Sequence, residues 1–243
     1  MNKLKPLPEE WSGLLNNEQK EAIENINGPL LIIAGAGSGK TRVLTYRYAH
    51  LIKTYGINFE NVLAITFTNK AANEMKDRIS DLLNLELSPK WISTFHSLCV
   101  KMLRIHGHLI GFNNNFTIYD QSDSTKLVRN CMRDSDIDTK QYSPKRIQAH
   151  ISSLKNQRIL PGEAVEFAQS FFDVKVAEIY SSYQKKLMLA NSMDFDDLLI
   201  KAVELLETSD KSLNYWSSKF QYIMIDEYQD TNMVQYRLVE LLA

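Results

Sequence analysis

The sequence has few cysteines, almost no net charge and no long apolar run. Its two cysteines, Cys99 and Cys131, form no Cys-x-x-Cys motif and have no neighbouring histidine pair at ligand spacing. This argues against structural zinc and favours two free thiols in a reducing compartment. The formal net charge of −1 supplies no overall basic field, so any binding to nucleic acid must use a local surface.

Membrane and export signals are also missing. Met1–Trp11 has no apolar signal-peptide core, and no later segment is apolar over the length needed to span a bilayer. A chain of 243 residues, 44% of them hydrophobic, can instead build a sizeable core as one large domain or two smaller ones. The composition therefore predicts a cytoplasmic globular protein without contact to a membrane.

Short apolar runs alternate with helical patterns along the chain. The first two runs precede apolar residues at helical spacing over Thr41–Lys53 and Ala71–Leu83. This alternation predicts an α/β fold with a parallel sheet covered by helices on both faces, and ligands beyond the carboxyl ends of its strands. The predicted strands are Leu30–Ala34, Val62–Phe67, Trp91–Phe95, Phe116–Asp120 and Tyr222–Asp226.

A glycine-rich loop follows the first predicted strand. Glycines in a strand-to-helix turn let backbone N–H groups approach phosphates, and the helix N-terminus adds positive potential. Lys40 would reach the outer phosphates and Thr41 would hold Mg²⁺. Ala34 stands where glycine is usual, but three flexible positions remain. The loop consists of Ala34, Gly35, Ala36, Gly37, Ser38, Gly39, Lys40 and Thr41.

An acidic pair ends the last predicted strand. Asp226 is placed to hold Mg²⁺ and Glu227 to activate water, while Gln229 can sense the γ-phosphate or bridge to a neighbouring site. An acidic pair alone is commonly a solvated turn, but the preceding apolar strand and the phosphate loop make this motif specific. Together the two motifs predict a nucleotide-hydrolysis site.

Helical patterns fill the long stretch between these motifs. Residues 121–192 contain predicted helices at Thr125–Arg133 and Val174–Leu189. Their small surplus of basic residues permits contact with nucleic acid, but it is equally consistent with a solvated helical surface. We therefore predict three segments: a nucleotide-binding domain over 1–120, a helical insertion over 121–192 and a return to the first domain over 193–243. The last helical pattern, Thr231–Ala243, has no stop signal, which favours a truncated chain.

The acidic motif Asp226–Asn232 and the loop Gly35–Arg42 resemble the UvrD/PcrA/Rep family of superfamily 1 DNA helicases. The resemblance implies the first RecA-like domain of an ATP- and Mg²⁺-dependent 3′-to-5′ helicase, acting on single-stranded DNA and its junctions with duplex in repair or replication. Its implied partners are the remaining C-terminal helicase domains, whereas accessory repair proteins stay unassigned.

Further segments agree with the family. Gln19 resembles the glutamine that reads the adenine edge, and Arg42 the arginine that stacks on adenine. Segments 64–72 and 91–97 are similar to motifs that touch single-stranded DNA. Phe67 would stack on bases, although without the resemblance it and His96 are more often ordinary structural residues. The implied DNA contacts are Thr66, Phe67, Asn69, Thr94 and His96.

Three functions remain open from the sequence. The first is the helicase motor domain, which by itself would bind ATP without unwinding, because the arginine fingers that relatives use have no counterpart here. The second is a stand-alone module that binds ATP and single-stranded DNA. The third, a nucleotide kinase or GTPase, leaves Gln19 and the DNA motifs unexplained. Asp194–Leu198 also resembles a family segment, and helix capping explains its carboxylates without a metal.

Overall fold

The structure is a computed structural model that describes residues 4–35, 37–85 and 89–243. The chain forms two compact units. The sheet unit comprises Met1–Phe95 with Trp216–Asp230, and the helical unit comprises His96–Tyr215 with Thr231–Ala243. These units are defined by packing within the fold, and the three segments expected from the sequence stay a prediction.

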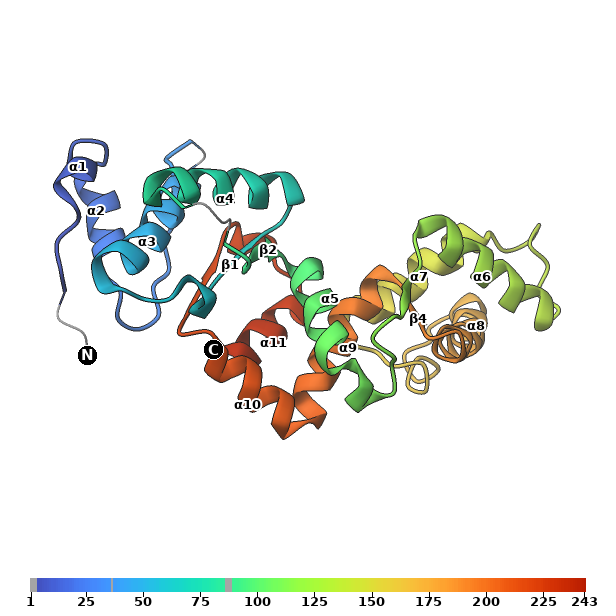
Figure 1. The fold of residues 1–243 in the computed structure, drawn as a ribbon. Coiled ribbons are helices and arrows are strands. Elements are labelled where there is room, and N and C mark those ends of the chain that lie inside the picture. The colour runs from blue at the N-terminus through green and yellow to red at the C-terminus, as the bar shows by residue number, and fades with distance from the viewer. Residues whose placement is uncertain (1–3, 36, 86–88) are drawn as a thin grey trace. The chain divides into compact units, whose positions relative to one another are not determined.

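A three-stranded parallel sheet forms the centre of the sheet unit, in the order β2-β1-β5 (Figure 1). Thr66 of β1 pairs with Thr94 of β2, and Ile65 of β1 pairs with Ile225 of β5, so the three strands end at one edge. The elements of this unit are α1 (Glu9–Ser12), α2 (Asn17–Glu24), α3 (Lys40–Tyr55), η1 (Phe59–Asn61), β1 (Val62–Thr66), α4 (Asn69–Leu83), β2 (Ile92–Thr94), β5 (Tyr222–Ile225) and η3 (Tyr228–Asp230).

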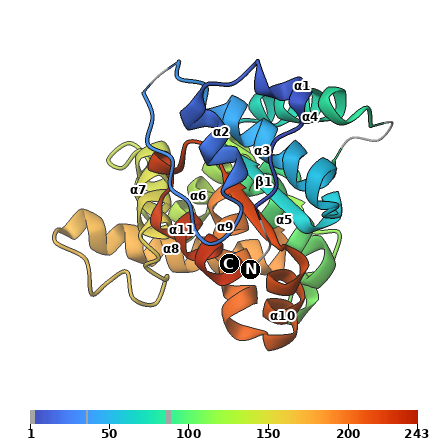
Figure 2. The same ribbon diagram turned by 90° about the vertical axis from the view of Figure 1, so that its left-hand side faces the viewer.

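Strand β1 is buried along its whole length, as expected for a parallel strand covered on both faces. On one face, Val62 and Ala64 of β1 pack against Tyr48 of α3 and Met75 of α4. Figure 2 shows α3 and α4 beside β1. The apolar spacing in these two helices explains why they cover the sheet, and the α/β fold expected from the sequence is confirmed.

The predicted strand at Leu30–Ala34 is wrong, because this segment forms no regular secondary structure and pairs with no strand. Leu31 is 69% exposed and Ile33 is 89% exposed, while Ile32 packs against a core cluster with Trp11 and Val43. A strand requires a hydrogen-bonding neighbour as well as apolar residues. Both edges of β1 are occupied by β2 and β5, and no strand of the described residues lies beside this segment.

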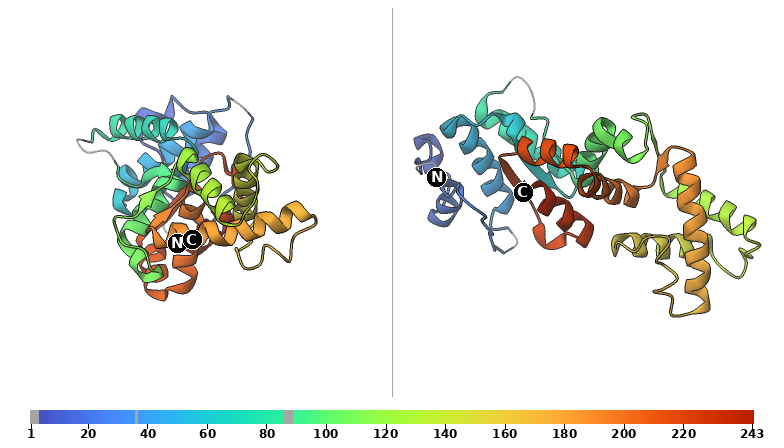
Figure 3. Two further views of the ribbon diagram at one scale, coloured as in Figure 1. Left: turned by 90° about the vertical axis from the view of Figure 1, so that its right-hand side faces the viewer. Right: turned by 90° about the horizontal axis from the view of Figure 1, so that it is seen from below.

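Helices dominate the second unit. Its core joins Val128 of α6, Ile147 of α7 and Tyr180 of α8, all fully or almost fully buried. Figure 3 shows these helices from two sides, with α8 in orange. The elements are α5 (Phe95–His106), η2 (Gly107–Ile110), β3 (Thr117–Ile118), α6 (Gln121–Asp134), α7 (Pro144–Asn156), α8 (Phe171–Leu189), β4 (Ser192–Met193), α9 (Phe195–Thr208), α10 (Asp210–Lys219) and α11 (Met233–Leu242). The unit boundary falls within α10, whose residues from Trp216 onward are counted with the sheet unit.

The run Phe116–Asp120 is shorter as a strand than expected and lies outside the main sheet. Only Thr117–Ile118 is extended and paired, as β3 with β4. Asp120 instead caps α6, since its carboxylate accepts the Asp123 backbone N–H at 2.8 Å. In the same way Asp194 caps α9 in a reciprocal box with Asp197, which confirms the capping interpretation of the Asp194–Leu198 segment. Across the described ranges, no helix is long and apolar enough to cross a bilayer.

Candidate nucleotide site and strand-end surface

The glycine-rich loop leads directly into α3. Gly37 and Gly39 have φ angles of 76° and 90°, a left-handed conformation that side chains disfavour. A Cβ on Gly39 would also lie 2.9 Å from Nε2 of Gln19. No side chain caps the first turn of α3, so its backbone N–H groups face the loop and can bind an anion.

Gln19 and Lys40 both contact this loop. Gln19 lies in the first turn of α2, where it forms a capping box with Asn16, and its Nε2 donates to the Ser38 carbonyl at 3.0 Å. The Lys40 ammonium donates to the carbonyl oxygens of Ala34 at 3.3 Å and Gly35 at 3.4 Å. These long contacts hold a cation over the loop, where a phosphate group can replace the carbonyls as its partner.

The remaining loop positions are less constrained. Ser38 donates its hydroxyl to the Gly35 carbonyl at 2.7 Å, which closes the turn. A Cβ on Gly35 would meet nothing within 4 Å, so steric crowding does not explain that glycine. Ala36, the other residue expected here, lies outside the described residues.

Thr41 and Asp226 meet although they are far apart in sequence. The Thr41 hydroxyl donates to Asp226 Oδ2 at 2.8 Å, and the Asp226 backbone N–H continues the sheet by donating to the Ile65 carbonyl at 2.9 Å. Hydroxyl and carboxylate oxygens are the kind of ligand that Mg²⁺ takes in proteins. Thr41 and Asp226 are therefore the residues that would hold Mg²⁺ at this site, where it would neutralise charge on a bound phosphate.

Strain marks the residue after Asp226. Glu227 has a φ of 51°, which is unusual for a residue with a side chain. Its carboxylate accepts a hydrogen bond from Gln229 Nε2 at 2.6 Å, and its backbone N–H donates to Asp226 Oδ1 at 3.1 Å. The carboxylates of Asp226 and Glu227 thus have different hydrogen-bond partners, Thr41 and Gln229 respectively.

A pocket of about 420 Å³ opens between α3 and α4 and is lined by residues of these two helices. Arg42 lines it, and its guanidinium carbon lies 5.7 Å from the ring centroid of Tyr46. Arg78 and Asp81 of α4 contribute further polar groups. Arg78 belongs to no sequence motif, because a single arginine on an amphipathic helix carries no pattern of its own.

The strand ends carry the residues expected to contact DNA. Phe67 follows β1 directly, is 37% exposed and meets Phe95 edge-to-face with ring centroids 6.1 Å apart. Asn69 is exposed at the first position of α4. Thr66 and Thr94 lie side by side but are buried, and the Thr66 hydroxyl donates to the Thr68 carbonyl at 3.1 Å. Phe67 and Asn69 are therefore the accessible members of this group.

His96, the fifth residue of that group, belongs to the helical unit. Its ring meets Phe195 of α9 edge-to-face at 6.0 Å, and burial lowers its pKa against the opposing effect of Asp196. Phe195 is 53% exposed, a large exposed aromatic ring that the capping interpretation of its segment overlooked. Its exposure could not be read from sequence, because an aromatic in a first helical turn can face either the core or solvent.

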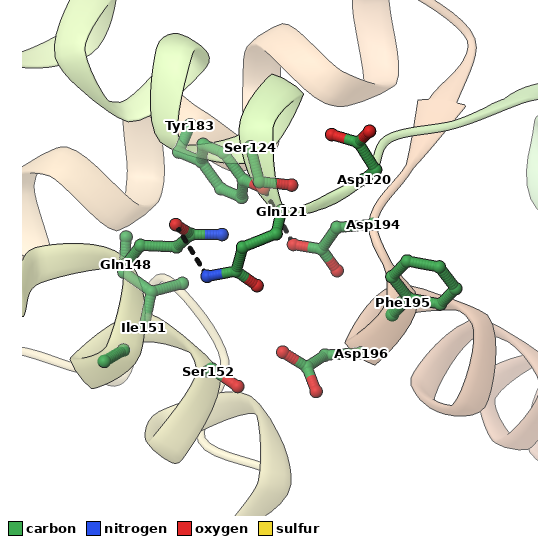
Figure 4. Close-up of a pocket in the computed structure, with 11 residues that line it drawn as sticks. Asp120, Gln121, Ser124, Gln148, Ile151, Ser152, Tyr183, Asp194, Phe195 and Asp196 are labelled. Atoms are coloured by element: carbon green, nitrogen blue, oxygen red, sulfur yellow. Dashed lines mark hydrogen bonds between the residues drawn. The ribbon is translucent and has the colours of Figure 1, made fainter. Parts of the chain in front are cut away.

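Phe195 also borders a polar pocket of about 260 Å³ between α6, α7 and α9 (Figure 4). Gln121 and Gln148 are hydrogen bonded at 3.2 Å on one side, while Asp194 and Asp196 point in from another. The described residues contain no group of three His, Cys, Asp or Glu side chains arranged for a metal ion. Carboxylates and amides give this pocket hydrogen-bonding capacity.

A parallel sheet, a glycine-rich loop at a helix N-terminus and a carboxylate ending another strand define a P-loop nucleotide-binding protein. The model of the UvrD/REP helicase N-terminal domain matches residues 15–243, and the chain belongs to this family. It is 47% identical over 229 residues to the ATP-dependent DNA helicases PcrA of Staphylococcus aureus (strain Mu50) and Staphylococcus epidermidis (strain ATCC 12228). These matches cover 94% of the chain and 31% of each relative.

Proposed function

We propose that this chain is the ATP-binding motor domain of a 3′-to-5′ DNA helicase that acts on single-stranded DNA in repair or replication. By itself it binds Mg·ATP but does not unwind DNA. The contact between Thr41 and Asp226 carries this proposal, because it joins the loop helix and the acidic strand end into one site. The PcrA relatives, which are named ATP-dependent DNA helicases, support the assignment of ATP and DNA.

The residues divide the work of phosphoryl transfer. The α3 N-terminus and Lys40 bind the phosphates, Thr41 and Asp226 hold Mg²⁺, and Gln19 with Arg42 holds the adenine. When bound, Mg²⁺ neutralises charge on the phosphate oxygens. Glu227 accepts a proton from the attacking water, and Gln229 orients the Glu227 carboxylate through their 2.6 Å hydrogen bond.

DNA contacts are proposed along the same strand ends. The exposed face of Phe67 stacks on a base without reading sequence, and Asn69 hydrogen-bonds the backbone. Thr66 and Thr94 act chiefly by shaping this edge, since both side chains are buried. In the helical unit, the rings of His96 and Phe195 form an aromatic pair that is proposed as a further contact for single-stranded DNA.

Nucleotide binding provides the direct test. Calorimetry of the 243-residue chain with Mg²⁺ and a non-hydrolysable ATP analogue should detect one site, and Lys40→Ala should weaken it at least about ten-fold through loss of a charged hydrogen bond. Lys140→Ala, which removes an exposed lysine of the helical unit, is the matched control. Equal affinity of the wild type and Lys40→Ala would contradict the phosphate-binding role.

The alternative function is a stand-alone module that binds ATP and single-stranded DNA without motor activity. An arginine finger accelerates such hydrolysis by about 10³–10⁵, so the motor domain alone should turn over ATP very slowly. An in-frame coding sequence after Ala243 with further Gln, Tyr and Arg motifs supports the helicase, whereas a stop codon supports the module. Robust unwinding by purified residues 1–243 would refute both descriptions of the isolated chain.

A further inference from the structure

The C-terminal turn of α7 carries a buried cation that the nucleotide chemistry does not use. Lys155 is 1% exposed, and its ammonium lies 2.7 Å from Asp194 Oδ2 and 2.7 Å from Asp197 Oδ1. Tyr183 of α8 donates to Asp194 at 2.8 Å, and Gln184 donates to Asp197 at 3.0 Å. This network ties α7, α8 and the start of α9 into one body, because every member has partners on another element.

The next residue, Asn156, connects this body to α11. Its Nδ2 donates to the Ser152 carbonyl at 2.8 Å and to Asp196 at 3.2 Å. Its Oδ1 accepts a hydrogen bond from Asn232 Nδ2 at 2.9 Å. Both ends of the Asn156 amide are therefore used, one toward α9 and the other toward α11.

Asn232 has a second task at the start of α11. Its Oδ1 accepts from the backbone N–H of Gln235 at 2.9 Å, and the Asn232 backbone N–H donates to Gln235 Oε1 at 3.1 Å. This capping box sets where α11 begins. Only Thr231 separates Asn232 from Asp230, the last residue of the turn that carries Glu227 and Gln229.

We infer that Asn156 is a positioning residue. Through its hydrogen bond to Asn232, it couples the conformation of the Glu227–Asp230 turn to the conformation of α7 in the helical unit. The inference rests on the proposed function. Glu227 has a left-handed φ of 51°, and in the proposed function a bound nucleotide acts on its carboxylate, so nucleotide binding can change the conformation of this turn. A displacement that reaches the α11 cap acts on the Asn156 amide. The Lys155 network keeps α7 and α9 rigid, so the displacement moves the α7 end as a whole.

Hydrogen exchange tests this coupling in the 243-residue chain. With Mg²⁺ and a non-hydrolysable ATP analogue, the wild type should change its exchange in the first turn of α11 and in the last turn of α7. In Asn156→Ala the α11 change should remain, while the α7 change should shrink about five-fold, as expected for loss of the part-buried hydrogen bond to Asn232. Nucleotide affinity should stay within about two-fold, since Asn156 belongs to the other unit and touches none of the proposed nucleotide ligands.

Gln157→Ala is the matched control. Gln157 is the next residue, and its side-chain amide donates to the Ser153 carbonyl and hydroxyl of α7 at 3.1 Å each. This variant should keep the full α7 response. An undiminished α7 response in Asn156→Ala, or a wild type whose α7 ignores bound nucleotide, overturns the inference.

A nucleotide-free comparison separates this inference from the proposed function. Without nucleotide, Asn156→Ala should speed exchange of the Gln235 amide relative to Gln157→Ala, because the Asn232 cap loses its support. Unchanged exchange there overturns the link between Asn156 and Asn232. Failure of the wild type to bind nucleotide in calorimetry would instead refute the proposed function, whatever the exchange of Gln235 shows.

Discussion

Replacing Lys155 with methionine should destabilise the helical unit strongly. Methionine keeps most of the side-chain volume, so the change removes charge and hydrogen bonds without opening a large cavity. Lys155 is almost fully buried between Asp194 and Asp197 at 2.7 Å each, and its loss leaves two buried carboxylates without a cation. Breaking such a pair costs about 3–5 kcal/mol. Tyr183 and Gln184 still donate to the carboxylates, so we expect about 3 kcal/mol.

The pH dependence carries a second signature of the same change. In the wild type, Asp194 is buried, which raises its pKa, but the Lys155 charge outweighs burial and holds that pKa below the usual value. This stabilisation is present above pH about 4 and is lost as the pH falls through the lowered pKa. In Lys155→Met, burying the carboxylates of Asp194 and Asp197 costs free energy only while they are ionised, and protonation at low pH removes this cost. The stability difference between the two proteins should therefore narrow between pH 7 and pH 4.

Urea unfolding followed by circular dichroism measures both effects. Lys145→Met, which changes an exposed lysine of the same helix, is the control and should alter the free energy of unfolding by less than about 0.5 kcal/mol. A loss below about 1 kcal/mol in Lys155→Met, or a stability difference that is constant from pH 7 to pH 4, would refute the view of Lys155 as the cation that holds α7 to α9.

Two further predictions concern the sheet unit. Phe67→Ala should weaken binding of a fluorescent oligothymidine by about 1–3 kcal/mol in anisotropy titrations. Phe167→Ala, which changes an exposed phenylalanine outside the strand-end motifs, is the control and should leave the affinity unchanged. Equal affinities of the wild type and Phe67→Ala would exclude stacking by Phe67. His50 is fully buried, and burial lowers its pKa, so the unfolded chain takes up a proton more readily. The free energy of unfolding should thus fall as the pH drops below about 6.5, and it should fall less steeply in His50→Gln. The same pH dependence in both proteins would contradict a lowered pKa of His50.

The accuracy of the sequence predictions followed the range of the interactions involved. The helix after the phosphate loop was expected from Thr41 and begins at Lys40, because glycines and apolar spacing act within a few residues. The prediction of a strand at Leu30–Ala34 was wrong, and of the strand predicted at Phe116–Asp120 only two residues form one. Both differences arise because strand pairing depends on which other strands lie alongside. Apolar composition alone does not specify a neighbour.

For the candidate site, residue types were easier to predict than contacts. The motifs predicted that Thr41 and Asp226 belong to one site, and in the structure the Thr41 hydroxyl lies 2.8 Å from Asp226 Oδ2. The left-handed backbone of Glu227 carried no signal in the sequence, because it depends on how the turn joins β5 to α11. The same holds for Phe195, whose exposure depends on the packing of α9.

The sequence by itself determined the local chemistry of this protein: glycines that permit left-handed turns, capping residues such as Asn16 and Asp194, and apolar spacing that gives each helix a buried face. Only the tertiary structure decided which distant groups meet. Lys155 became a buried cation and Asn156 a partner of Asn232 because packing brought each of them beside groups many residues away in sequence. Such pairings depend on the whole fold, since desolvation and hydrogen-bond geometry are set by neighbours that no local pattern encodes.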